Sequence, residues 1–145
     1  MATKRFEETA TINAPASAIY NYVSDFTKHG EWAGNGLSAA QVGDGPVGVG
    51  TQFNTTAKQF GTQREQSTIT QMDAPKTFEW DSTGALGRVH HWFHLTESGG
   101  STTVAKGGEI VAPKFLGKIM GGKLAKDMPA GFRRDLANIK AKLEA

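Results

Sequence analysis

The chain carries three kinds of hydrophobic pattern, one after another. Residues 4–12 alternate weakly between apolar or hydroxyl side chains and acidic ones, which predicts a first β-strand. Asn13 and Pro15 follow, and the apolar residues after them recur at helical spacing, so a short helix is predicted over residues 15–24. A second short helical piece is expected over residues 25–32.

Between residues 34 and 111 the pattern changes to short runs rich in Thr, Val, Phe and Trp, separated by Gly, Pro, Asp and Ser. These runs predict six strands: Leu37–Val42, Thr51–Lys58, Gln63–Met72, Thr77–Ser82, Arg88–Thr96 and Thr102–Val111. Because all of the connections are short, consecutive strands are expected to pair antiparallel.

The end of the chain is predicted to be helical. Its apolar residues step mostly by four: Leu116, Met120, Leu124, Met128, Phe132, Leu136, Ile139 and Leu143. Such a stripe drifts by about 40° per step around a helix of 3.6 residues per turn. The helix therefore either curls around a rounded core or is interrupted, and Gly121-Gly122 and Pro129 are the places for an interruption. We expect a short helix over 114–120 and a long one over 123–143, bent near Pro129.

Composition adds limits to this α+β architecture of a sheet covered by a long terminal helix. A length of 145 residues suits one domain spanning residues 1–145. The lack of cysteine excludes disulfides, thiolate metal sites and a cysteine nucleophile. Residues 1–12 contain no long apolar run, and no stretch approaches the ~20 apolar residues of a membrane helix. We therefore expect no signal peptide, no integral membrane association and a cytoplasmic location.

The net charge of +2 is unevenly spread, since residues 113–145 hold eight Lys or Arg against three Asp or Glu. A basic helix could meet anionic lipid or nucleic acid. This one lacks interleaved aromatic residues and a dense run of charge, which favours a solvated helix face and no nucleic-acid partner.

Four segments stand in a characteristic order before the terminal helix. They are "INAPASAIYNYVSDF" (12–26) with Trp32 after it, "VGVGTQF" (47–53), "APKTFEW" (74–80) and "FHLTESGGSTTV" (93–104). Together they resemble the START-like superfamily of helix-grip proteins, in its polyketide cyclase/dehydrase and lipid transport branch. One departure is Ser101-Thr102, where relatives often have Gly-Thr.

The resemblance spans nearly the whole chain and implies a helix-grip fold. In that fold a curved seven-stranded antiparallel sheet wraps around the C-terminal helix, two short helices follow the first strand, and a cavity lies between sheet and helix. The resemblance does not imply one activity, because members include lipid carriers, hormone and metabolite binders, aromatic cyclases and interaction domains.

Strand alternation assigns faces to the side chains. In residues 88–96 the more apolar set, predicted to face the core, is Val89, His91, Phe93 and Leu95. The outer set contains His90, Trp92 and His94. Strand alternation, the stripe of the terminal helix and, for Trp32, the resemblance predict this cavity lining: Trp32, Phe53, Thr55, Ser67, Ile69, Phe78, Trp80, His91, Phe93, Met120, Leu124, Met128 and Phe132. Glu65 shares the parity of Ser67.

Such a lining suits a small, mostly hydrophobic or aromatic ligand held by a few hydrogen bonds, although the same residues could simply fill a core. The first functional interpretation is carriage or sensing of that ligand. The second is an enzyme of the aromatic cyclase or dehydratase type, a lyase or isomerase without cofactor, with His91 as acid or base. In the alternative to that role, His91 only forms a hydrogen bond within the lining.

The third interpretation is an interaction or regulatory domain that uses the outer Trp92 face, for instance in a homodimer. The alternative is that long neighbouring side chains cover Trp92. Metal binding is not predicted, because His90 and His94 lie about 13 Å apart along one strand and His91 points the other way. The G-x-G-x-x-G pattern over 43–48 precedes a strand instead of a helix, so no nucleotide cofactor is predicted either.

Lys106 shares the inward parity of Val104, but Gly107-Gly108 beside it suggests a bulge that would reset the face. The position of Lys106 therefore stays open at this point.

Overall fold

The computed structural model describes the backbone of residues 2–34, 36–58, 62–84, 87–112 and 114–145, and the side chains in these ranges except those of residues 2, 3 and 112–124. The first elements are strand β1 (Ala2–Ile12), helix α1 (Ala16–Val23), the 3-10 turn η1 (Phe26–Lys28) and helix α2 (His29–Ala33). Six strands and one helix follow: β2 (Ser38–Gln41), β3 (Gln52–Lys58), β4 (Thr62–Asp73), β5 (Thr77–Gly84), β6 (Gly87–Ser98), β7 (Ser101–Ala112) and α3 (Lys114–Leu143).

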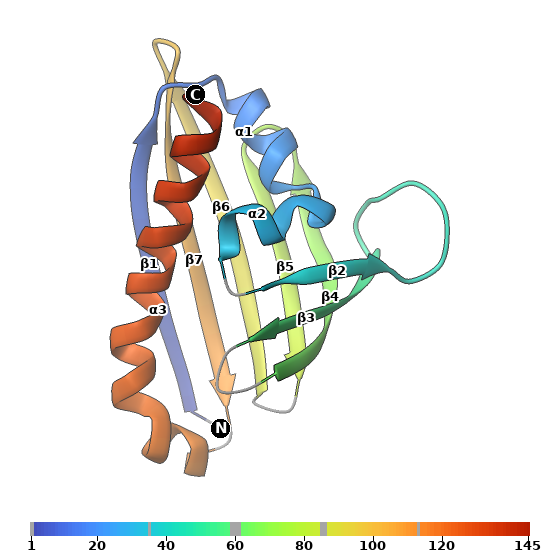
Figure 1. Cartoon of the computed structure of the whole chain (residues 1–145), viewed down its shortest axis with the longest axis vertical. Coiled ribbons are helices and arrows are strands. Elements are labelled where there is room, and N and C mark those ends of the chain that lie inside the picture. Colours follow the sequence, from blue (N-terminus) through green and yellow to red (C-terminus); the bar gives the residue numbers. More distant parts are fainter. Residues whose placement is uncertain (1, 35, 59–61, 85–86, 113) are drawn as a thin grey trace.

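The seven strands form one antiparallel sheet in the order β1-β7-β6-β5-β4-β3-β2. Figure 1 shows that the sheet curves and that α3 lies along its β1 and β7 side, while α1 and α2 cover the neighbouring part of the same face. The predicted helix-grip architecture of the α+β class is thereby confirmed, with all seven strands in the expected places.

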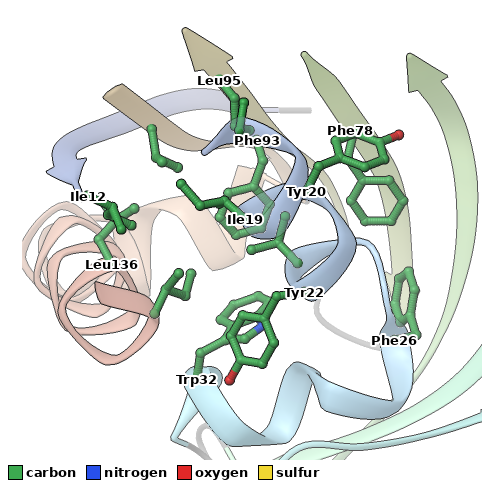
Figure 2. Close-up of a cluster of buried hydrophobic side chains, with 14 of the residues drawn as sticks. Ile12, Ile19, Tyr20, Tyr22, Phe26, Trp32, Phe78, Phe93, Leu95 and Leu136 are labelled. Carbon is green, nitrogen blue, oxygen red and sulfur yellow. The ribbon is translucent and has the colours of Figure 1, made fainter. Parts of the chain in front are cut away.

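The core forms where α1 and α3 pack on the same face of the sheet (Figure 1). Figure 2 shows Ile12, Ile19, Phe93 and Leu136 converging from β1, α1, β6 and α3. All four are buried, and the cluster around them continues through Val23, Tyr20, Phe78 and Ile139. Burial of one such side chain contributes about 1.5–3 kcal/mol, so this cluster holds the end of α3 firmly against the sheet.

Helix α3 is continuous from Lys114 to Leu143 and contains Pro129. The predicted division into two helices at Gly121-Gly122 is therefore wrong. A glycine inside a helix costs only about 1 kcal/mol relative to alanine, which a helix supported by a sheet can tolerate. In its second half the buried set is Phe132, Asp135, Leu136 and Ile139, which follows the 3.6-residue period and places Asp135 between two apolar turns.

The predicted bulge at Gly107-Gly108 is also wrong. The register of β7 with β6 runs without a break from Arg88–Val111 to Ser98–Ser101, and its register with β1 is equally regular. The described sheet instead has an irregularity in β4, between Ile69 and Gln71. The regular register keeps Lys106 on the inner face, with Val104.

Side chains of β1 cover Trp92 on the outer face of β6. Trp92 is only 2% exposed, and its ring is covered by Arg5, whose guanidinium carbon lies 4.1 Å from the ring centre. Its Nε1 donates a hydrogen bond of 2.7 Å to Glu7 Oε2. Trp92 is thus covered by long side chains of its own chain, the alternative to an exposed Trp92. The expectation of a dimer through an exposed Trp92 loses its basis.

Candidate ligand-binding site

A cavity of about 430 Å³ lies between the sheet, the η1–α2 segment and the middle of α3. The sheet contributes Thr55, Ala57, Lys58, Glu65, Ser67, Trp80, Ser82, His91 and Lys106. The helical segments, together with Leu37 just before β2, contribute Phe26, His29, Trp32, Ala33, Leu37, Asp127, Met128, Ala130, Gly131, Phe132, Arg134 and Asp135. Its size falls in the range of about 300–1,000 Å³ that is usual for small-molecule sites.

The structure brings together about half of the residues that the sequence predicted for this wall: Trp32, Thr55, Ser67, Trp80, His91, Met128 and Phe132. Four others are buried in the solid core, and they are Phe53, Ile69, Phe78 and Phe93. Their inward direction was predicted correctly, but Phe26 stacks on Phe53 with ring centres 4.4 Å apart and Tyr20 meets the edge of Phe78. No space for a ligand remains there. The side chains of Met120 and Leu124 lie outside the described residues.

Aromatic rings form the apolar part of the wall. Trp80 is stacked on His91 with ring centres 4.8 Å apart, and Phe26 meets the edge of Trp80 at 5.7 Å. Trp32 and Phe132 close the side that faces α3. Trp32 Nε1 is buried and has no hydrogen-bond partner among the described residues, so the wall offers an unused donor there.

His29 lies at the edge of this aromatic wall and is held in place by its neighbours. Its ring is stacked on Phe26 with centres 4.1 Å apart, and its Nε2 lies 2.8 Å from the Val23 carbonyl oxygen. Burial lowers the pKa of His29 to about 3. The ring is therefore neutral at neutral pH, Nε2 donates to the carbonyl, and Nδ1 is left as an acceptor.

His91 faces the cavity from the middle of β6. Burial, reinforced by the positive charge of Lys106, lowers the pKa of His91 well below its ordinary value. Its Nδ1 is buried without a hydrogen-bond partner in the described part of the chain. Among the described residues Nδ1 thus has no carboxylate that would hold the ring in one tautomer, which distinguishes His91 from a histidine prepared to move protons.

Hydroxyl groups line the part of the cavity wall that β3, β4 and β5 form. Ser67 and Ser82 are hydrogen-bonded through their Oγ atoms at 2.8 Å, and Thr55 Oγ1 donates to the Glu65 carbonyl oxygen at 3.2 Å. Burial raises the pKa of the Glu65 carboxyl group. Ser82 was missed by the sequence reasoning, although it shares the parity of Phe78 and Trp80 on the same strand.

A buried ion pair is the strongest electrostatic feature of the wall. Lys106 on β7 is 3% exposed, and its Nζ lies 3.6 Å from Oδ2 of Asp135, which is 7% exposed. The guanidinium of Arg134 lies 3.6 Å from the other oxygen, Oδ1. Burial lowers the pKa of Lys106, and the charge of Asp135 opposes this shift. Burial likewise raises the pKa of Asp135, against the opposing charges of Lys106 and Arg134.

The histidines on the outer face have a different role. His90 is hydrogen-bonded to Asp81 through Nδ1 at 2.6 Å and to Glu79 through Nε2 at 2.8 Å, and His94 reaches the second oxygen of Glu79 at 2.8 Å. In the described ranges no three His, Asp or Glu side chains are arranged to hold a metal ion.

Within the same ranges no helix has the length and hydrophobicity needed to cross a membrane.

Comparison with known proteins agrees with this geometry. The sequence model of the family described as polyketide cyclase / dehydrase and lipid transport matches residues 3–144. The chain belongs to this family. Family membership and the fold support a ligand-binding hydrophobic cavity, the coarse function that the aromatic wall indicates. No curated protein matches the chain in sequence.

Solved structures of this fold are similar to the chain at low sequence identity. The protein TTHA0849 from Thermus thermophilus has a TM-score of 0.77 and 15% identity, over 97% of each chain. StfQ, a di-domain ARO/CYC from the steffimycin biosynthetic pathway, has a TM-score of 0.80 and 13% identity over 98% of this chain, which spans 51% of StfQ. Ara h 8.0201 has a TM-score of 0.65 and 17% identity, over 95% of this chain and 98% of its own. At these identities the likeness shows the fold alone.

Proposed function

We propose that this chain binds a small, mostly apolar molecule between the sheet and α3, and that it carries or senses that molecule. The observation that supports this function best is the cavity of about 430 Å³ itself. A family member whose inward residues simply filled a core would have no such space. The ligand's rings or chains would pack on Trp32, Trp80 and Phe132, and a few polar groups would orient it.

The enzymatic alternative has less support from the geometry. A cyclase or dehydratase with His91 as acid would need an imidazole that is protonated near neutral pH, whereas burial lowers the pKa of His91 well below its ordinary value. His91 Nδ1 has no hydrogen-bond partner in the described part of the chain. His91 fits better as a hydrogen-bond acceptor that orients the ligand. His91→Ala should then weaken ligand binding, and no catalysed reaction should depend on His91.

The function is tested with N-phenyl-1-naphthylamine, an uncharged probe whose fluorescence rises in apolar surroundings. We expect saturable binding with one site per chain. Ala57 lies on the cavity wall and is buried, so Ala57→Phe places a ring in the cavity and should reduce probe affinity at least tenfold. Asn54 is an exposed residue of the same strand that points to the other face, so Asn54→Phe is the matched control.

Further measurements complete this experiment. Circular dichroism and thermal melting show that both variants fold. Native mass spectrometry of the purified chain then identifies any small molecule that stays bound. A chain that binds no probe, or one whose affinity for the probe is equal in the Ala57→Phe and Asn54→Phe variants, would refute the proposed site.

The cytoplasmic location belongs to the same proposal, since a carrier or sensor of a metabolite would act where that metabolite is made.

A further inference from the structure

The ammonium group of Lys106 has an unusual environment for a buried charge. Its partner Asp135 lies at 3.6 Å, beyond the roughly 3.2 Å limit of a good N–H···O hydrogen bond. Its other close neighbours are rings, with centres 4.1 Å away for Phe132, 5.4 Å for Trp32 and 5.5 Å for Phe93. Rings stabilise a cation but accept no hydrogen bond of ordinary strength. The N–H groups of Lys106 therefore have no close oxygen acceptor among the described residues.

The charges next to Lys106 come from helix α3. Asp135 lies between two cations, Lys106 and Arg134, and the side chain of Arg134 is 54% exposed. The two imidazoles whose pKa values respond to Lys106, those of His29 and His91, are both neutral at neutral pH. Among these groups Lys106 is thus the buried cation, and it shares its one counter-charge with Arg134.

A second unused donor lies close to the first. Trp32 is 3% exposed and lines the cavity, and its Nε1 is buried with no hydrogen-bond partner in the described ranges. The unpartnered acceptors, His91 Nδ1 and Asp135 Oδ1, could receive a hydroxyl group of a ligand, whereas Lys106 and Trp32 present donors to a ligand oxygen. Leaving a buried donor unpaired destabilises the protein, and a ligand oxygen that accepts its hydrogen bond would remove that cost.

We propose that the ligand of this cavity carries an oxyanion, such as a carboxylate, phenolate or enolate oxygen, which Lys106 binds while the aromatic wall holds the apolar body. This inference rests on the proposed function and names its ligand class: an amphipathic acid instead of a neutral hydrocarbon or alcohol. The rival view is that Lys106 and Asp135 only stabilise the fold.

The experiment uses two competitors that differ only in their polar group. Each displaces bound N-phenyl-1-naphthylamine from the full chain at pH 7: naphthalene-2-carboxylate in one series and 2-naphthalenemethanol in the other. A charge-assisted hydrogen bond should give the carboxylate about a tenfold lower Kd than the alcohol. In Lys106→Met, which keeps the unbranched shape of the side chain but is one atom shorter and has no charge, the ratio of the two Kd values should fall to about one. Lys28→Met removes an exposed lysine as a control and should keep the tenfold ratio.

The outcomes distinguish the binding of an oxyanion by Lys106 from the binding of any apolar ligand in the cavity. If the probe binds but the wild type shows no preference for the carboxylate, or Lys106→Met retains that preference, the oxyanion inference is wrong and the cavity function stands. If the probe does not bind at all, the cavity function fails and the inference fails with it. Should Lys106→Met not fold, the double variant Lys106→Met/Asp135→Asn avoids leaving a buried carboxylate alone and gives the same reading. The wild-type comparison of the two competitors needs no variant.

Discussion

The indole of Trp92 lies across the backbone of Gly107, its direct partner in the register of β6 and β7. A Cβ atom at position 107 would lie 2.0 Å from Trp92 Cε2, a distance that no real contact allows. Gly107 also pairs with Glu7 on its other side, in β1. The missing side chain therefore opens a path along which the indole crosses β7 and donates its hydrogen bond to Glu7.

Gly107→Ala should displace the indole and with it the cover that Arg5 and Glu7 provide. Overpacking at a buried site costs about 1–3 kcal/mol, and we expect the upper end of that range because the clash involves a rigid ring. Urea denaturation measures the change in the free energy of unfolding. Gly108→Ala is the matched control, since its Cβ would meet the end of the Phe132 ring at 3.0 Å and a small shift of that ring suffices. Equal losses in the two variants would contradict the explanation.

His29 should make the chain sensitive to mild acid. The folded state holds this imidazole neutral, with a pKa of about 3, while the unfolded chain takes up a proton near the ordinary value of about 6.5. The stability from this difference is fully present above the unfolded pKa and is lost as the pH falls below it. Between pH 7 and pH 5 the loss amounts to about 2 kcal/mol.

His29→Gln is the variant that tests this effect. The glutamine amide can still donate a hydrogen bond to the Val23 carbonyl but does not titrate. The free energy of unfolding of the variant, measured in urea at pH 7, 6 and 5, should fall less steeply than that of the wild type by about 2 kcal/mol over the range. Parallel pH profiles for the two proteins would show that the burial of His29 does not control acid stability.

His90 should act in the opposite direction on the outer face. Burial tends to lower the pKa of His90, but the hydrogen bonds and charges of Asp81 and Glu79 outweigh it and raise this pKa. A raised pKa in the folded state adds stability that is fully present below the unfolded pKa and is lost as the pH rises through the folded one. His90 is partly exposed, so solvent screening limits the effect to about 0.5 kcal/mol.

The melting temperature of His90→Gln should therefore lie below that of the wild type at pH 6 and approach it at pH 8.5. Because the ion pairs with Glu79 and Asp81 are partly exposed, 1 M NaCl should shrink the difference at pH 6. A difference that grows toward alkaline pH, or one that is insensitive to salt, would be inconsistent with this assignment.

The period of two along the strands was enough to predict much of this site. It placed His91 on the inner face and His90, Trp92 and His94 on the outer one, because alternation is a local property of each strand. It could not separate wall from solid core, since Phe78 and Trp80 share a parity and differ only in what covers them. That cover comes from α1 and η1, which are distant in sequence from β5.

The charged part of the site was harder to predict for a related reason. Asp135 does not belong to the apolar stripe of the terminal helix, and only its meeting with Lys106 makes its burial acceptable. The face on which Lys106 lies was itself left open, because Gly107-Gly108 suggested a bulge. The glycines instead make room for Trp92 on one face and Phe132 on the other, a relation between three elements that no single segment reveals.

The buried pair makes a prediction about stability that is independent of any ligand. Asp135→Asn leaves the Lys106 ammonium without a counter-charge in a cavity wall, and removing one partner of a buried pair typically costs about 3–5 kcal/mol. We expect a loss near the lower limit, because the rings around Lys106 retain part of the stabilisation of its charge.

The double variant Lys106→Met/Asp135→Asn distinguishes this cause from a simple packing defect. Replacing both charges removes the uncompensated ion, so the double variant should be more stable than Asp135→Asn alone, with a coupling energy of about 1–3 kcal/mol in a double-mutant cycle. Urea denaturation of the four proteins at pH 7 gives that energy. Arg134, whose side chain is 54% exposed, contacts the same carboxylate, and Arg134→Met in its place should show a coupling below about 1 kcal/mol because water screens it. If the Lys106 and Asp135 losses simply add, the two residues do not stabilise each other, and the explanation of the Asp135→Asn loss by an uncompensated ammonium is wrong.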